Sequence, residues 1–300
     1  MRLNYQITNK CNLNCKYCYL VEKNKKSREI TEKDCNNLIN FINKNCKIDS
    51  ILLTGGEACL NNNILNIIKN ISIRDIEIDI FTNGKFLEDK YIYLHKFFKN
   101  INISLDLNKD WSKRYGYDLQ YLRTLCQKIR KFESPEKIKI YTTIEDSSIK
   151  EIDLIKHLDY LLSLKISKVA LNLANNLVDN KKLITEFSKI LKNLRFLFRG
   201  KIKISSNVID SLDLRLYKEF YIKLFMNNIW CDWNNNLSYF PRDNVNNYIL
   251  GKEKFFSKEE LIQSEKIMNN IYKKILLQDE GTILLTKLER DFNYECNRNK

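Results

Sequence analysis

Short runs rich in Ile, Leu, Val and Thr alternate with longer amphipathic stretches from residue 3 to residue 175 of this 300-residue chain. Six of these runs have the composition of β-strands, at residues 3–8, 50–55, 76–83, 101–107, 139–145 and 168–175. Helical patterns separate them: one begins where Thr31 is followed by Asp34, and others span about 87–98, 117–131, 150–163 and 179–195. Every link is long enough for a right-handed crossover between parallel strands. The alternation therefore predicts an α/β fold of six βα units, a partial or complete βα barrel.

Polar residues lie at the carboxyl end of each predicted strand. In such folds the βα loops converge there on one mouth and carry the functional groups. The residues are Thr8 and Asn9, residues 54–57, residues 82–84, Ser104 and Asp106, Thr143 and Glu145, and Asn172 and Asn175. A functional site is therefore expected at this edge of the sheet.

The alternation changes after about residue 200, where shorter apolar runs are interleaved with Asn, Pro and Gly. We expect a core domain at residues 1–200 and a small C-terminal α+β region at residues 201–300. The sequence contains no low-complexity linker and no internal repeat beyond the βα alternation, and Pro135 and Pro241 both fall in predicted loops. The two regions are therefore expected to pack together.

The sequence predicts a soluble, cytoplasmic protein. No stretch reaches the roughly 20 uncharged apolar residues needed to cross a bilayer, and the N-terminus enters a polar, cysteine-containing segment without an apolar signal region. The nine cysteines are an odd number, with three of them inside eight residues. This pattern fits thiolate chemistry in a reducing compartment better than it fits disulfides.

The formal net charge of +14 is large enough to attract nucleic acid, an acidic peptide or a membrane surface. The lysines are scattered, as Lys139, Lys165, Lys168 and Lys181 illustrate, so a genome-wide bias in composition explains much of the excess equally well. Charge alone therefore leaves nucleic acid open as a partner without selecting it, and no membrane partner is expected.

Three cysteines, Cys11, Cys15 and Cys18, directly follow the first predicted strand. Their thiolates can bind three corners of a cubane iron–sulfur cluster and leave the fourth iron open to a substrate. The alternatives are a zinc site, which takes four ligands, and a chance group of small hydrophobic residues. The two histidines, His95 and His157, fall in predicted helices, where a packed or solvated role is the default. The pattern therefore favours an iron–sulfur cluster.

The segment CNLNCKYCYL, followed by LLTGGE, FTNG and SLD at successive strand ends, resembles the radical S-adenosylmethionine (SAM) superfamily. The resemblance implies a partial (β/α)6 barrel and one 4Fe–4S cluster held by the three cysteines. It also implies that SAM chelates the open iron and is cleaved to a 5'-deoxyadenosyl radical, which abstracts a substrate hydrogen. The Tyr-Cys-Tyr ending most resembles members with SPASM or twitch extensions, many of which modify peptides.

The same resemblance assigns SAM-binding roles to residues near the cysteines. Tyr17 matches a position whose ring lies beside the adenine, although plain packing is the alternative. Gly55 and Gly56 let backbone carbonyls approach the methionine amine, and Glu57 supplies a negative charge to it. Taken alone, two glycines and a glutamate indicate only a turn.

Later strand ends match further positions of the superfamily. Asn83, Ser104 and Asp106 match residues that contact the ribose, the methionine carboxylate or the substrate. Arg114 matches an arginine that contacts a carboxylate, but the surrounding DLNKDWSKR lacks the glycine and histidine of the usual pattern. A solvated helix residue is the alternative reading of Arg114.

In the C-terminal region, CDWNNNLSYFPRDNVNNYILGK resembles the opening of a SPASM domain, with a cysteine, a strand, a turn at 241–244 and a returning strand. Full SPASM and twitch domains carry several cysteines for auxiliary clusters, whereas this region offers Cys231 and Cys296. We therefore predict a degenerate remnant that holds substrate and carries no auxiliary cluster. Cys231 is either a buried small residue or a hydrogen-atom donor to a substrate radical.

These features predict a radical SAM enzyme that acts on a ribosomally made peptide by epimerisation, cross-linking or oxidation. The alternatives are modification of RNA or a small metabolite, and a non-catalytic iron–sulfur binding or sensing protein. The expected partners are the peptide and a reducing protein such as flavodoxin or ferredoxin. The sequence does not select the substrate, the bond attacked, the way in which the substrate radical is quenched or the oligomeric state.

Overall fold

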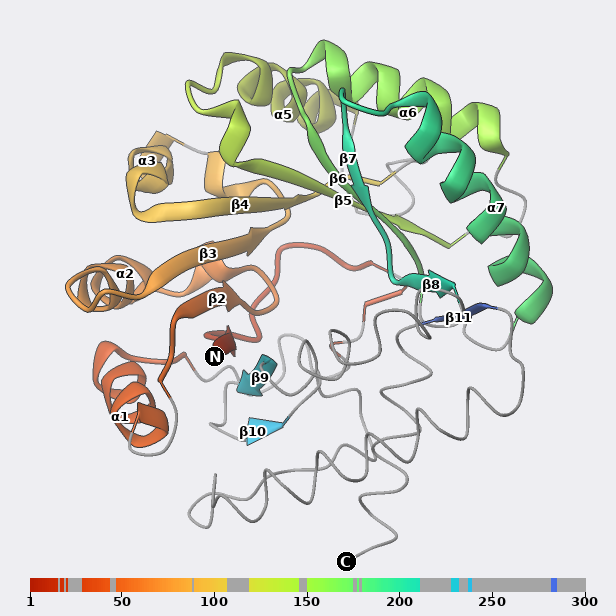
Figure 1. The fold of residues 1–300 in the computed structure, drawn as a ribbon. Coiled ribbons are helices and arrows are strands. Elements are labelled where there is room, and N and C mark those ends of the chain that lie inside the picture. The colour runs from red at the N-terminus through yellow and green to blue at the C-terminus, as the bar shows by residue number, and fades with distance from the viewer. Residues whose placement is uncertain are drawn as a thin grey trace, which may run out of the picture.

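The computed structural model is an α/β protein built on one large, mostly parallel sheet (Figure 1). It describes residues 1–15, 17–18, 20, 29–43, 47–87, 89–106, 119–145, 150–174, 177, 180–210, 228–231, 237–238 and 282–284. The sheet runs in the order β10-β9-β1-β2-β3-β4-β5-β6-β7. In the described part of the chain it ends at β10 on one side and at β7 on the other, so the barrel is open.

Six strands follow one another across the sheet as the sequence predicts. They are β1 (Arg2–Gln6), β2 (Ser50–Thr54), β3 (Glu77–Thr82), β4 (Phe98–Ser104), β5 (Ile138–Ile144) and β6 (Lys168–Leu173). Each pairs in parallel with the next one along the chain. The predicted partial βα barrel is therefore confirmed.

Helices line the outer side of the sheet (Figure 1). They are α1 (Glu32–Asn43), α2 (Ile64–Ser72), α3 (Asp89–Ile92), α5 (Leu119–Lys131), α6 (Glu151–Ser163) and α7 (Lys181–Leu197), with 3₁₀ turns at Ala58–Leu60, Lys85–Leu87, Tyr93–Phe97 and Pro135–Lys137. Helix α1 begins as predicted. The backbone N–H of Thr31 donates to the Asp34 carboxylate (3.0 Å), and the N–H of Asp34 donates to the Thr31 hydroxyl (3.2 Å).

The prediction of a continuous helix at about 87–98 is wrong. The chain there forms only the four-residue α3 and a 3₁₀ turn before β4 begins at Phe98. Phe98 is buried, pairs with Ile78 and packs edge-to-face on Phe86, with ring centroids 5.3 Å apart. The sheet therefore takes Phe98 out of the expected helix, and the residues before it are divided between α3 and the 3₁₀ turn.

The two faces of the sheet differ in chemistry. On one face Leu53, Ile80 and Ile101 are neighbours in register, and they are buried in the same hydrophobic core as the helices. On the other face Gln6 lies beside Thr54. Strand β5 alternates in the same way between buried and partly exposed positions. The sheet therefore has an apolar outer face for the core and a more polar inner face.

Strands from the C-terminal part of the chain extend the sheet at both edges. They are β7 (Lys203–Ser205), parallel to β6; β9 (Asn228–Cys231), parallel to β1; and β10 (Leu237–Ser238), antiparallel to β9. Strands β8 (Val208–Asp210) and β11 (Thr282–Leu284) form a separate small sheet beside α7.

The turn expected at 241–244 and Cys296 lie outside the described residues. Sequence patterns miss β7 and the β9–β1 pairing, because strands this short carry too little periodicity.

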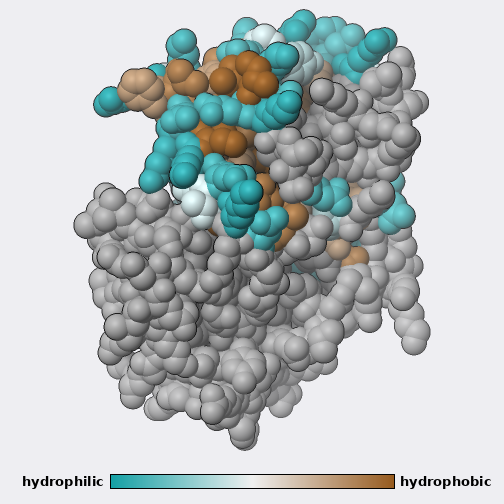
Figure 2. All heavy atoms as spheres, turned by 90° about the vertical axis from the view of Figure 1, so that its right-hand side faces the viewer, coloured by the Kyte–Doolittle hydropathy of each residue, from teal (hydrophilic) through white to brown (hydrophobic). Residues whose placement is uncertain are grey.

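The surface around α7 carries both hydrophilic and hydrophobic residues. Phe196 and Leu197, at the end of α7, are 77% and 52% exposed. Figure 2 views the molecule from this side and shows hydrophilic and hydrophobic residues interspersed over the described part of the face. Within the described ranges, no helix is both long and apolar enough to cross a membrane.

Candidate functional site

The cysteine segment is the stretch that leaves the sheet after β1 and returns before α1. Its two ends meet at Thr8 and Glu29, which form an antiparallel bridge. Cys11, Cys15 and Cys18 are partly exposed, and none of them is in a disulfide. The N–H of Cys18 donates to the carbonyl of Cys15 (3.2 Å), so the last two cysteines lie on one tight turn.

The donor chemistry of this segment fits an iron–sulfur cluster. Three cysteines supply three sulfur ligands, and the N–H of Leu13 donates to the sulfur of Cys11 (3.4 Å). His157 is buried in α6, and Nε2 of His95 pairs with Glu133 (2.8 Å). Among the described residues, no three His, Cys, Asp or Glu side chains are grouped as they would be around a metal ion. The thiols thus fit a cluster by chemistry and spacing rather than by a preformed cage.

Gly55 and Gly56, just after β2, pass very close to the cysteine segment. A Cβ atom on Gly55 would lie 2.4 Å from the carbonyl oxygen of Thr8, and one on Gly56 would lie 2.3 Å from that of Lys10. Two backbone hydrogen bonds join the segments, from Gly56 to Thr8 (3.0 Å) and from Glu57 to Lys10 (2.8 Å). The glycines are therefore needed for the contact between two backbones, a reason that sequence reasoning did not supply.

Glu57 is only 1% exposed, and its carboxylate accepts hydrogen bonds from two elements. Oε1 accepts from the N–H of Cys59 (3.1 Å) and the hydroxyl of Thr82 (2.9 Å), and Oε2 accepts from the N–H of Asn83 (2.7 Å). Burial raises the pKa of this carboxyl, whereas the hydrogen bonds from Asn83, Cys59 and Thr82 act in the opposite direction. The carboxyl group thus joins the turn after β2 to the end of β3.

The end of β3 also reaches the cysteine segment. Nδ2 of Asn83 donates to Oδ1 of Asn12 (2.9 Å), and Asn12 lies between the first two cysteines. Gly84 follows with a φ of +108°, which residues with a Cβ atom rarely adopt. The cysteine segment, the turn at Gly55 to Glu57 and Asn83 therefore form one contiguous group.

Tyr17 and Asp106 connect the cysteine segment to the far side of the sheet. The Tyr17 hydroxyl donates to Oδ2 of Asp106 (2.5 Å), and the N–H of Thr143 donates to Oδ1 (2.7 Å). Asp106 is fully buried, whereas Ser104, the last residue of β4, is half-buried. Arg114 lies outside the described residues. One carboxyl group therefore links Tyr17 to the ends of β4 and β5.

A buried histidine, His157, supports the link between Tyr17 and Asp106 through Thr142. The hydroxyl of Thr142 donates to the carbonyl of Leu105 (2.8 Å), so it accepts the hydrogen from Nε2 of His157, 2.9 Å away. Burial lowers the pKa of His157 to about 4, so the ring is neutral at neutral pH. His157 therefore has the packed role that its helical position predicts, and it helps to hold the carbonyl that precedes Asp106.

Sequence reasoning missed two asparagines, Asn12 within the cysteine segment and Asn61, which contacts both of its ends. For Asn12 the only signal is its position inside the cysteine motif. Asn61 is 1% exposed and donates to the carbonyls of Ile7 (2.6 Å) and Ile30 (3.0 Å). It begins a run of three asparagines, which by itself indicates only a loop.

A model of the radical SAM superfamily matches residues 5–158, which hold the cysteine segment, the turn at Gly55 to Glu57 and Asp106. The chain belongs to the radical SAM superfamily. The members of this superfamily are enzymes whose cofactors are a 4Fe–4S cluster and S-adenosylmethionine. The chain is therefore an enzyme of this class with the same two cofactors.

Individual relatives and solved structures resemble this radical SAM chain in different ways. A GTP 3',8-cyclase of Clostridium perfringens is 35% identical over 162 residues, which cover 51% of this chain and 50% of the relative. The chain therefore spans about half the length of that relative. SuiB of Streptococcus suis bound to precursor peptide SuiA superimposes with a TM-score of 0.61 at 14% identity, covering 79% of this chain and 58% of SuiB. The structure of anSMEcpe with bound AdoMet and Cp18Cys peptide gives a TM-score of 0.62 at 14% identity, covering 99% and 97%. At these identities the structural likeness shows the fold alone.

Proposed function

We propose that this radical SAM protein cleaves S-adenosylmethionine reductively and uses the resulting 5'-deoxyadenosyl radical to abstract a hydrogen atom from a peptide. The observation that carries the proposal is the contact between the cysteine segment and the turn at Gly55 to Glu57, made by hydrogen bonds to the carbonyls of Thr8 and Lys10. This contact brings the thiols assigned to the cluster next to the backbone assigned to the methionine group.

In this proposal Cys11, Cys15 and Cys18 hold the cluster, which supplies the electron for cleavage of S-adenosylmethionine. The carbonyl oxygens of Gly55 and Gly56 receive the methionine amine. The whole set of residues assigned to S-adenosylmethionine is Tyr17, Gly55, Gly56, Glu57, Asn83, Ser104, Asp106 and Arg114. Most of the described members lie within two contiguous hydrogen-bonded groups, which supports a shared ligand.

A peptide substrate is supported by the Tyr-Cys-Tyr ending of the cysteine motif and by the folds of SuiB and anSMEcpe, both solved with a peptide bound. The polar inner face of the sheet also suits a substrate rich in amide groups. We assign residues 201–300 to a SPASM- or twitch-like region that holds the peptide, and a flavodoxin or ferredoxin to the supply of electrons. Epimerisation, cross-linking and oxidation all begin with the same hydrogen abstraction.

A nucleotide is the second candidate substrate. The 35% identity with a GTP 3',8-cyclase, over 51% of this chain, favours it. The net charge of +14 also suits a ligand that carries phosphate groups. A nucleotide would make the chain a modifier of a small metabolite rather than of a peptide.

The first experiment tests the radical chemistry. Anaerobically reconstituted protein is mixed with dithionite and S-adenosylmethionine, and 5'-deoxyadenosine is measured by mass spectrometry. We expect its formation by the native chain and none by a variant that lacks the three cysteines. Native protein that holds about four irons yet forms no 5'-deoxyadenosine, with any candidate substrate, would contradict the proposal.

The second experiment separates the two substrate classes. The rate of 5'-deoxyadenosine formation is compared after addition of GTP and after addition of synthetic peptides encoded by short reading frames beside the gene. The proposal expects a peptide to raise the rate and to change in mass, while GTP does neither. Consumption of GTP, with no effect of any peptide, would select the nucleotide instead.

A further inference from the structure

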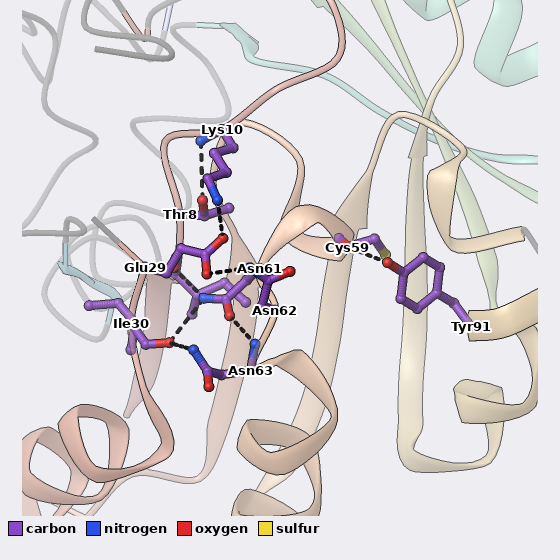
Figure 3. A network of polar contacts seen from close by, with 10 residues as sticks. Thr8, Lys10, Glu29, Ile30, Cys59, Asn61, Asn62, Asn63 and Tyr91 are labelled. Carbon is purple, nitrogen blue, oxygen red and sulfur yellow. Dashed lines mark hydrogen bonds and ion pairs between the residues drawn. The ribbon is translucent and has the colours of Figure 1, made fainter. Parts of the chain in front are cut away.

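We propose that Asn61 is a positioning residue that holds the two ends of the cysteine segment together and fixes them against the turn at Gly55 to Glu57. Figure 3 shows the contacts, which join three parts of the chain far apart in sequence. The proposal rests on the proposed function, because it concerns how the chain places the thiols assigned to the cluster.

The Asn61 side chain reaches both ends of the segment at once. Its Nδ2 donates to the carbonyl of Ile7, where the chain leaves the sheet (2.6 Å), and to the carbonyl of Ile30, where the chain returns (3.0 Å). Its Oδ1 accepts from the N–H of Asn63 (2.6 Å). The opposite orientation of the amide would set its oxygen against two carbonyl oxygens, so these contacts define the orientation. Asn61 thus bridges the two ends through both hydrogens of its amide.

These contacts lie out of reach of water. Ile7 and Ile30 are fully buried, and Asn61 is 1% exposed. The N–H of Ile30 also donates to the carbonyl of Ile7 (3.0 Å), so the side-chain bridge reinforces a backbone hydrogen bond between the same two ends. Removal of the amide would take a donor from two buried carbonyls, and water could not replace it without opening the segment.

A second layer of contacts lies nearer the surface. Oε1 of Glu29 accepts from Nζ of Lys10 (2.6 Å), and Oε2 accepts from Nδ2 of Asn62 (3.0 Å). Nδ2 of Asn63 donates weakly to the carbonyl of Ile30 (3.4 Å). Lys10 directly precedes the first cysteine, and Glu29 begins the returning chain. All three consecutive asparagines therefore contact the returning end of the cysteine segment.

The bridge is continuous with the proposed cofactor site. The N–H groups of Gly56 and Glu57 hold the outgoing end of the segment, Asn61 holds the returning end, and the 3₁₀ turn Ala58–Leu60 joins them. One short stretch, residues 56–63, therefore sets the position of the thiols relative to the backbone assigned to the methionine group. Closing a segment of this length costs conformational entropy, so thiols on an open segment would meet less often.

The first test uses full-length protein before any cluster is added. Asn61→Ala is compared with Asn70→Ala, a matched control in which the lost amide donates to Glu32 (2.9 Å), between α2 and α1. Hydrogen exchange at the N–H of Ile30 and alkylation of each cysteine by iodoacetamide are followed by mass spectrometry. We expect both to become at least about tenfold faster in Asn61→Ala and to stay unchanged in Asn70→Ala.

A second substitution separates positioning from packing. Asn61→Asp keeps the size of the side chain, but its carboxylate would face the two carbonyl oxygens of Ile7 and Ile30. When protonated, the same group can donate to one of them. Hydrogen exchange at the N–H of Ile30 in Asn61→Asp, relative to the native chain at the same pH, should therefore be fast at neutral pH. In mild acid it should become slower again, part of the way to the native rate. In Asn61→Ala the same exchange should stay fast at both pH values.

Reconstituted protein gives a third readout. We expect Asn61→Ala to hold fewer irons per chain and to show a smaller effect of S-adenosylmethionine on the electron paramagnetic resonance of the reduced cluster. Because exchange and alkylation are measured without a cluster, they decide on the bridge even if no 5'-deoxyadenosine is ever formed. Failure of this inference and failure of the proposed function are therefore distinguishable.

Exchange and alkylation in Asn61→Ala that match the native rates would overturn the proposal. If circular dichroism shows that Asn61→Ala is unfolded, the test passes to Asn62→Ala and Lys10→Met, which remove only the outer contacts to Glu29. An increase of about threefold in alkylation of the cysteines supports the proposal, and no increase overturns it.

Discussion

The carboxyl ends of β1 to β3 and those of β4 to β6 are built differently. On the first side the buried amide of Asn61 joins both ends of the cysteine segment, and the buried carboxyl group of Glu57 joins the turn after β2 to the end of β3. On the second side the described link is Asp106, which holds Tyr17 and Thr143, while Ser104 remains half-buried. Among the described residues, the first side thus has the more extensive hydrogen bonding to the cysteine segment.

We assign the cluster and the methionine amine to the first side, and Ser104 and Asp106 on the second side to further contacts with S-adenosylmethionine. A cofactor shared by a whole superfamily needs a preformed site, and buried hydrogen bonds within the chain provide one. We therefore expect substitutions on the β1–β3 side to affect cluster and stability most, and those on the β4–β6 side to have smaller effects.

The largest effect is expected from replacing Cys11, Cys15 and Cys18 together by Ala. Iron in the reconstituted protein should fall from about four atoms per chain to almost none, because no three thiolates remain on the segment. Colorimetric iron and sulfide analysis measures this directly. A control variant in which Cys35 and Cys126 are replaced by Ala should keep its iron. Loss of iron from this control, together with no loss of iron from the triple variant, would place the cluster elsewhere.

Gly56→Ala should be the most damaging single change on the β1–β3 side. The added Cβ would lie 2.3 Å from the carbonyl oxygen of Lys10 and 2.8 Å from Cβ of Cys11. We expect the free energy of unfolding to fall by about 3 kcal/mol, measured by urea denaturation. Gly200→Ala is the control: its Cβ would meet no atom within 4 Å, and its φ of +77° should cost only about 1 kcal/mol. Equal losses in the two variants would contradict close packing at Gly56.

His157 should give the β4–β6 side an acid-sensitive stability. Its pKa is about 4 in the folded chain, below the ordinary 6.5, so the unfolded state binds the proton more readily. Stability is therefore complete above pH 6.5 and is lost as the pH falls towards 4, by about 2 to 3 kcal/mol. The measurement is urea denaturation of the native chain and His157→Phe across this range. A slope that persists unchanged in the variant would assign the sensitivity to other groups.

Tyr17→Phe should have the smallest effect, because it removes one hydroxyl from the contact with Asp106 and leaves the ring in place. We expect a loss of about 1 kcal/mol in stability and retention of the cluster, with a larger change in the KM for S-adenosylmethionine than in kcat. Tyr93→Phe, at a residue that is 49% exposed, is the neutral comparison. A loss of cluster in Tyr17→Phe would remove the distinction between the two sides.

Local patterns predict most of the sheet but not its edges or its irregular connections. The six long strands are found to within a few residues, since each lies in a short run rich in Ile, Leu, Val or Thr. The link before Phe98 is missed because tertiary burial of that ring overrides a helical pattern. Of the proposed site, the cysteines, the glycines, Glu57, Asn83 and Asp106 are assigned from motifs, whereas Asn12 and Asn61 have no comparable signal.

The sequence by itself determined the order of the βα units and the order in which cysteines, glycines and strand-end polar residues follow one another, because both are local properties of the chain. Only the tertiary structure decided what those residues touch. It shows that Gly55 and Gly56 make room for the cysteine segment, that Glu57 is buried between two strand ends, and that Asn61 bridges Ile7 and Ile30. Such contacts join residues tens of positions apart, and no periodic pattern in a single sequence encodes them.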